Sequence, residues 1–178
     1  MKLFSYFFTG ALIALMLNSC SENDELKNGN QELIGSWMAT EINFEGNSAI
    51  ETTGNIVSTS FSGDGYNMAL QIRFDENSNE FTSFGAYNIH LNTNHHGHSS
   101  ITEWMNPGFI QCGKWNKNGN DLLITNHKGE TQSATILSLD QQRLVLSYNF
   151  TYKTKQFDSS VTYEVGGIFT FEKQLVNQ

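Results

Sequence analysis

Apolar and polar residues alternate with a period of two along most of the chain after residue 33. The clearest runs are "NMALQIRF" (67–74), "FGAYNIHL" (84–91), "RLVLSYNFTY" (143–152) and "VTYEVGGIFTF" (161–171). Successive side chains of a β-strand point to opposite faces, so this alternation predicts strands with one buried face. Helical periodicity is absent from any long segment, and only "ITEWMN" (101–106) is predicted to form a short helical turn.

Turn-forming residues separate these runs at short intervals. They are found in "SGDG" (62–65), "DENSNE" (75–80), "NKNGN" (116–120), "NHKGE" (126–130) and "LDQQ" (139–142). Asn-Gly and Asp-Gly provide the positive-φ positions that tight hairpins require. Many short strands with regular turns predict an all-β antiparallel fold, either a barrel or a β-sandwich.

One face of the predicted strands is rich in large apolar and aromatic side chains. A barrel of about eight strands is just wide enough either to be filled by such side chains or to hold one ligand. In the second case an apolar lining favours a small apolar molecule. The candidate lining residues lie on the strand face that is predicted to point into the barrel: Met68, Leu70, Ile72, Phe74, Tyr87, Ile89, Tyr148, Phe150, Tyr163 and Phe169.

The first 32 residues follow a different pattern. Residues 1–19 combine Lys2 with an apolar run, which is typical of an export signal and is shorter than the roughly 20 residues needed to span a bilayer. Residues 21–32 contain one apolar side chain among charges, Asn and Gly, so they predict a flexible acidic tether. The chain then divides into a signal peptide (1–19), Cys20 with the tether (20–32) and one β-domain (33–178).

Cys20 ends the segment Leu17-Asn18-Ser19-Cys20, which resembles the lipobox of bacterial lipoproteins. The resemblance implies that the leader is removed before Cys20 and that Cys20 carries acyl chains such as palmitate. Two or more chains give stable membrane anchoring. It also implies a lipoprotein of a Gram-negative cell envelope. Ser21 after the cysteine favours the outer membrane, with the domain either periplasmic or surface-exposed.

The net charge and the cysteine content limit which partners and which disulfides we expect. The formal net charge of −8 repels nucleic-acid phosphates, so we expect no nucleic acid partner. If Cys20 is acylated, Cys112 is the only remaining cysteine, and no intrachain disulfide can form. We expect Cys112, in "GFIQCGKW" (108–115), to be a buried small apolar side chain within a strand, and the domain to be a monomer.

Three histidines in "NTNHHGHSS" (92–100) are weak candidates for metal ligands: His95, His96 and His98. The flanking Asn, Thr, Ser and Gly residues predict instead a polar loop over 92–106 near the barrel mouth, in which no rigid scaffold orients the imidazoles. We therefore expect no metal and no cofactor. The chain contains no G-x-S-x-G or H-E-x-x-H motif and no phosphate-binding loop, so we expect no enzymatic activity.

Gly35 and Trp37 in "ELIGSWMATEI" (32–42) resemble the G-x-W signature of lipocalin-like barrels, in which the Trp closes the barrel bottom. "GKWNKNGNDLLIT" (113–125) and "ATILSLDQQRLVLSYNF" (134–150) resemble lipocalin-like domains of bacterial lipoproteins. The resemblance covers residues 33–173 and implies a closed up-and-down barrel of eight to ten strands. The T-D-Y motif is absent. The last strand lacks the arginine that packs over the Trp in that family, and Lys173 stands at its end.

Two functions follow. The first is a lipid-anchored envelope protein whose lipocalin-like barrel binds a small hydrophobic ligand without catalysis. The alternative is a surface module that recognises protein or glycan through exposed loops, using Trp104 and the segment 92–109.

Overall fold

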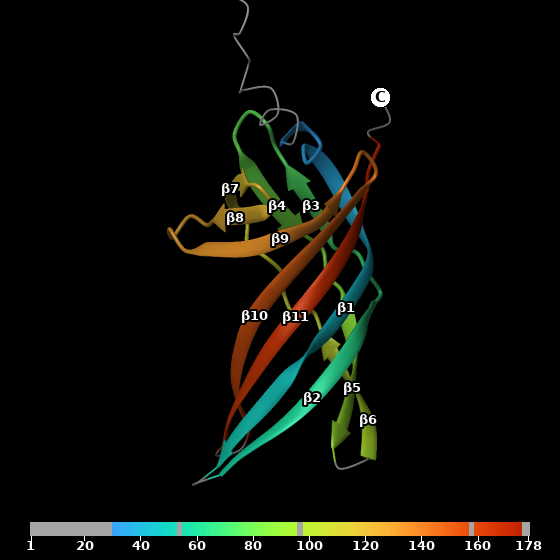
Figure 1. Ribbon diagram of the computed structural model, residues 1–178, viewed down its shortest axis with the longest axis vertical. Coiled ribbons are helices and arrows are strands. Elements are labelled where there is room, and N and C mark those ends of the chain that lie inside the picture. The colour runs from blue at the N-terminus through green and yellow to red at the C-terminus, as the bar shows by residue number, and fades with distance from the viewer. Residues whose placement is uncertain (1–29, 53–54, 96–97, 157–158, 176–178) are drawn as a thin grey trace, which may run out of the picture.

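The computed structural model describes residues 30–52, 55–95, 98–156 and 159–175, which contain one antiparallel sheet of eleven strands (Figure 1). The strands are β1 (Gly35–Thr52), β2 (Asn55–Tyr66), β3 (Gln71–Phe74), β4 (Glu80–Phe84), β5 (Asn88–His95), β6 (His98–Met105), β7 (Gly113–Asn118), β8 (Asp121–Thr125), β9 (Thr131–Leu139), β10 (Arg143–Gln156) and β11 (Ser159–Lys173). The predicted all-β antiparallel fold is confirmed.

Eight of the strands close into a barrel, in the order β11-β10-β9-β8-β7-β4-β3-β1, because β1 also pairs with β11. This closing register runs from Trp37↔Lys173 to Glu51↔Ser160. The eight strands follow one another as an up-and-down meander, which two excursions interrupt: β2 after β1, and the β5–β6 hairpin after β4. A barrel therefore forms in place of the β-sandwich alternative.

β1 is shared by two parts of the molecule. Its first residues, Gly35–Met38, pair with β3 inside the closed barrel, whereas Asn43–Thr52 pair with β2. β5 and β6 continue from β2, and these strands lie beside the long ends of β1, β10 and β11 in the lower half of Figure 1. We call β2, β5 and β6, together with the long ends of β1, β10 and β11 beside them, the extension. Within the described residues, no helix is both long and apolar enough to cross a membrane.

Hydrogen-bonded turns form at four of the five predicted positions. Asn79, Gly119 and Gly129 adopt positive φ at the hairpins that follow β3, β7 and β8. Asp140 caps the fourth turn by accepting hydrogen bonds from the N–H groups of Gln142 and Arg143, both 2.8 Å long, and these bonds lower the pKa of its carboxyl group. The fifth prediction is wrong, because "SGDG" (62–65) lies inside β2.

Glycines at 63 and 167 are required by packing where the closed barrel meets the extension. Phe44 of β1 is paired with Gly167 of β11 on one side and with Gly63 of β2 on the other. A Cβ atom at Gly167 would lie 2.8 Å from the Phe44 ring and 2.6 Å from the Phe169 ring. A Cβ atom at Gly63 would lie 2.7 Å from the carbonyl oxygen of His90. Glycine thus leaves room for the Phe44 and Phe169 rings at position 167 and for strand β5 at position 63.

Trp37 lies at the upper end of the barrel, fully buried, with its Nε1–H donating to the carbonyl of Leu33 at 2.8 Å. The Lys173 ammonium lies 4.9 Å from the centre of the Trp37 ring and donates to the carbonyl of Glu32 at 3.0 Å. Gly35 has a φ of +123°, and a Cβ there would be 3.1 Å from Cε of Lys173. Lys173 thus covers Trp37 with a cation, although the arginine of the resembled family is missing.

Gly167→Ala should lower the free energy of unfolding by about 1–3 kcal/mol, because the added methyl group meets the Phe44 and Phe169 rings in a packed interior. The matched control is Gly166→Ala. A Cβ there would meet only the Asn149 carboxamide oxygen at 3.1 Å and the Glu45 carbonyl at 3.7 Å. Urea unfolding followed by near-UV circular dichroism measures both. Equal losses for the two variants would contradict the packing argument.

Lys173→Ala should destabilise the barrel by about 1 kcal/mol through loss of the cation above Trp37 and of the aliphatic stem that covers it. Lys128→Ala, at an exposed turn residue, serves as the control for the removed charge. Thermal unfolding followed by circular dichroism measures the effect. A Lys173→Met variant that behaves like Lys173→Ala would identify the charge, and not the stem, as the stabilising part.

Candidate functional site

The ten candidate lining residues separate into two groups. Seven are almost completely buried, with exposed fractions between 0% and 7%: Leu70, Ile72, Phe74, Tyr87, Ile89, Tyr148 and Phe169. The other three, Met68, Phe150 and Tyr163, are partly buried and pack against this core. Most of the set therefore belongs to the hydrophobic core, and only a few members lie where an incoming molecule could reach them.

Aromatic rings pack against one another inside the closed barrel. The Phe74 ring lies 5.2 Å from that of Phe81 and 5.6 Å from that of Trp115, centre to centre. Phe109, which follows β6 in the chain, lies 4.6 Å from Phe169. Such edge-to-face and tilted contacts are favourable beyond simple area burial. At these positions the barrel interior is a packed core.

A second group of rings lines the inner face of the extension and is less completely buried. The centre of the Trp104 ring on β6 lies 6.2 Å from Phe150, 5.7 Å from Tyr152 and 6.0 Å from Tyr163. Trp104, Phe150 and Tyr163 are partly buried, and 45% of Tyr152 is exposed. We call these four side chains the aromatic compartment.

Strand register places all four side chains on one face. Trp104 is paired with Ile89 of β5, which is fully buried, so both point inward. Phe150 and Tyr152 alternate with the outward Asn149 and Thr151 along β10, and Tyr152 is paired with Tyr163 of β11. Trp104 thereby brings β6 against β10 and β11 through ring contacts. Within the described residues, β6 has backbone pairing only with β5.

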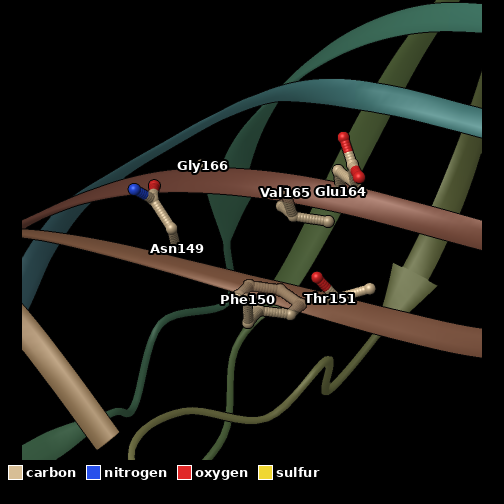
Figure 2. A pocket seen from close by; sticks show the side chains of 6 residues that line it. All are labelled: Asn149, Phe150, Thr151, Glu164, Val165 and Gly166. Atoms are coloured by element: carbon tan, nitrogen blue, oxygen red, sulfur yellow. The ribbon is translucent and has the colours of Figure 1, made fainter.

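A pocket of about 390 Å³ opens on the outer face of the β10–β11 pair, on the opposite side of the sheet from the aromatic compartment. Its lining residues are Asn149, Phe150, Thr151, Glu164, Val165 and Gly166. In Figure 2 the Phe150 ring lies on the opposite side of β10 from the Asn149 carboxamide, so polar groups and an aromatic ring surround the same short stretch of sheet. Gly166 contributes no side chain, which leaves space between Asn149 and Glu164.

Two tyrosine hydroxyls above the compartment are engaged in hydrogen bonds. Tyr87 donates to the carbonyl of Gly108 at 2.5 Å, and Tyr148 accepts from the Gln132 carboxamide at 2.7 Å. Burial raises the pKa of both phenols, and the hydrogen bond from Gln132 partly offsets this for Tyr148. Both side chains are therefore neutral at physiological pH. A polar but uncharged environment of this kind suits an apolar or weakly polar molecule.

The polar loop predicted at 92–106 is wrong, and so is the helical turn at 101–106. The described residues of both segments belong mainly to the β5–β6 hairpin, whose register runs from Asn88↔Met105 to His95↔His98. By register, the polar Thr93 and Thr102 share the inward face with Ile89, Leu91 and Trp104, and the outward residues of β6 include Ile101 and Met105. The segment is a strand pair at the end of the sheet that carries polar residues on both faces.

The candidate metal ligands are only partly described. His95 and His98 are paired at the end of the hairpin, and His96 lies outside the described residues. In the described part of the chain, no three His, Cys, Asp or Glu side chains come close enough to hold a metal ion. His90 instead lies 3.7 Å from the Asp64 carboxylate and stacks on the Tyr66 ring at 3.9 Å.

The predicted burial of Cys112 in a strand is wrong. Cys112 is exposed and immediately precedes β7. Its Sγ accepts a hydrogen bond from the N–H of Ser83 at 3.3 Å and lies 3.5 Å from the carbonyl oxygen of the same residue. The thiol therefore links the segment before β7 to β4 beyond the backbone pairing of these two strands.

Sequence reasoning treated Trp104 as an exposed recognition residue and missed its place in the aromatic compartment. Alternation along β6 gave no usable signal, because it sets the apolar Ile101 and Met105 on the face opposite to Trp104. Cys20 and the tether 20–29 lie outside the described residues, and Gly35 and Trp37 stand at the barrel end already described.

The described geometry can be compared with known proteins. A family model described as a lipocalin-like domain matches residues 33–146, which is more than half of the chain. No curated protein and no solved structure gives a significant match. The matched region contains the Gly35–Trp37 pair, the meander β3–β9 and the start of β10. With its closed eight-stranded antiparallel barrel, the chain belongs to the lipocalin-like domain family.

Proposed function

We propose that this protein is a lipid-anchored module of a Gram-negative cell envelope that binds a small apolar ligand without catalysis, and that the ligand occupies the aromatic compartment. A lipocalin-like barrel fits a module that binds small ligands. The observation that carries the choice of site is the incomplete burial of Trp104, Phe150, Tyr152 and Tyr163, in contrast to the packed rings of the closed barrel.

Chemistry at the compartment favours an apolar molecule with a flat or aromatic part. Four rings whose centres lie about 6 Å apart offer faces and edges for stacking. None of the four is a basic or acidic residue, which favours an uncharged molecule. The Asn149 and Thr151 side chains lie on the outer face of β10 and do not reach this site. Binding there requires the rings to separate, because Trp104 now contacts the other three side chains.

Recognition of protein or glycan by an exposed Trp104 is less well supported. Its ring is only partly exposed and makes contact with three other rings, so little of it is available to a large partner. The ring is better placed to cover a small molecule than to anchor a macromolecule.

Anchoring through Cys20 rests on the lipobox-like segment and the acidic tether that follows it. The tether of about 12 residues reaches at most about 40 Å when extended. That length holds the barrel clear of the lipid headgroups. Outer-membrane placement, with the barrel either periplasmic or surface-exposed, belongs to the same proposal.

Trp104→Ala should weaken binding of the neutral fluorescent probe N-phenyl-1-naphthylamine by about tenfold, because truncating a central aromatic side chain costs more than about 1 kcal/mol. Ile101→Ala on the outer face of the same strand is the matched control, since Ile101 is 72% exposed. Fluorescence titration measures both dissociation constants. If Trp104→Ala fails to fold, Tyr152→Ala with Ile168→Ala as its control tests the same site. Unchanged probe affinity in the compartment variants would place the ligand elsewhere.

Cys20→Ala should move the protein from the membrane fraction to the soluble fraction and abolish metabolic labelling with an alkyne analogue of palmitate. Cys112→Ala is the matched control and should keep both the membrane location and the label. Fractionation with immunoblotting and in-gel fluorescence measure the outcome. A Cys20→Ala protein that stays membrane-bound and labelled would refute the anchor, with no consequence for the ligand site.

A further inference from the structure

β6 is the last strand of the sheet, and its outer edge carries backbone groups that have no strand partner. The strand order ends β2-β5-β6, and within the described residues β6 pairs with β5 alone. In an antiparallel strand, alternate residues direct N–H and C=O groups away from the paired neighbour. Such an edge is a template for another extended chain.

This edge lacks lysine, proline and a β-bulge, and Glu103 is the one charged side chain within residues 99–105. Proteins guard exposed edges with lysine, proline or a β-bulge. The segment "SSITEWM" (99–105) contains neither lysine nor proline, and its register with β5 is continuous. The outer edge of β10 differs: its pairing with β9 ends at Ser147, and Lys153 and Lys155 follow along the uncovered part. The uncovered edge of β10 therefore carries lysines, whereas the edge of β6 carries none.

The outer face of β6 has a specific pattern of side chains. Ile101 is 72% exposed and Met105 is 64% exposed, with Glu103 between them on the same face. A chain paired with β6 would place its own side chains directly opposite these three. Apolar residues would face Ile101 and Met105, and a cation would face Glu103.

The neighbouring strands strengthen the preference for a cation. Glu103 is paired with His90, and His90 with Asp64, so the three side chains form one row across β6, β5 and β2. The row contains two carboxylates and no lysine or arginine. The Tyr66 ring stacks on the ring of His90, the cross-strand partner of Glu103, at 3.9 Å.

We infer that the outer edge of β6 binds an extended segment of a partner protein by strand addition. The segment carries a lysine or arginine opposite Glu103 and apolar residues two positions before and after it. Backbone hydrogen bonds provide the binding, and the apolar–cationic–apolar alternation provides the specificity. The site is separate from the aromatic compartment, because Ile101, Glu103 and Met105 point to the opposite face from Trp104.

A second copy of this chain fits the edge poorly. A symmetric antiparallel pairing that sets Ile101 against Met105 of the other copy also sets Glu103 against Glu103. Like charges directly opposite each other are destabilising in a sheet. The overall charge of −8 adds to this repulsion.

The test uses the full chain and a fluorescein-labelled nonapeptide, TSVTKTVST, that has the required alternation, together with a matched peptide carrying Glu in place of Lys. Fluorescence anisotropy should show saturable binding of the Lys peptide. Glu103→Lys should weaken it about fivefold and strengthen the Glu peptide by a similar factor, as expected for an exposed cross-strand ion pair. Glu45→Lys, on the outer face of β1, makes the same change in net charge and should alter neither.

Amide hydrogen exchange tests whether the peptide pairs with the backbone of β6. Amide hydrogen exchange at residues 99–105 should slow when the Lys peptide is bound, and Ile101→Lys, which places a guard residue on the edge, should abolish binding. The inference is overturned if the Lys peptide does not bind, if Glu103→Lys and Glu45→Lys have equal effects, or if protection appears away from β6. Sedimentation showing a peptide-free dimer that Ile101→Lys dissociates would assign the edge to a second copy and also overturn it.

Discussion

The Phe44 ring packs against Gly167 at the level where β1 exchanges β3 for β2 as its pairing partner, and the two halves of the molecule depend on this contact. β1 pairs with β11 along almost its whole length, so one strand belongs to both the closed barrel and the extension. A side chain at position 167 would occupy the space that the Phe44 ring fills. Phe44 also contacts Tyr87, Phe150 and Phe169, which links the two interiors through one side chain.

The two halves differ in how completely their inner faces are buried. In the closed barrel every strand has two neighbours, so inward side chains are surrounded and reach native packing density. The extension has free edges at β6 and along β10, and its inner rings remain partly accessible. Separating rings in a partly buried cluster loses fewer contacts than opening a packed core. This difference explains why ligand binding is proposed at Trp104 and its neighbours and not in the barrel centre.

Strand faces were predictable because alternation is a local property of the chain. Ile72 and Phe74 are buried as their spacing predicts, and so are Tyr148 and Phe169. The segment "SGDG" shows where local reasoning fails: the same residues suit a tight turn and a strand position that is closely packed against its neighbours. Only the position of Ile89 and Leu91 on the adjacent strand shows that Gly63 is small for reasons of packing. Likewise, the polar residues at 92–106 look like a loop until their pairing at the sheet edge is known.

By itself, the sequence determined the antiparallel β-class, four of the turns and the identity of most core residues, because these depend on side-chain period and on backbone preferences of single residues. Tertiary structure decided that β1 is shared, that Lys173 covers Trp37, that Cys112 is exposed and that Trp104 joins Phe150, Tyr152 and Tyr163. Each of these involves residues far apart in the chain or the end of a sheet. Their contacts depend on strand order and closure, which alternation along one strand does not encode.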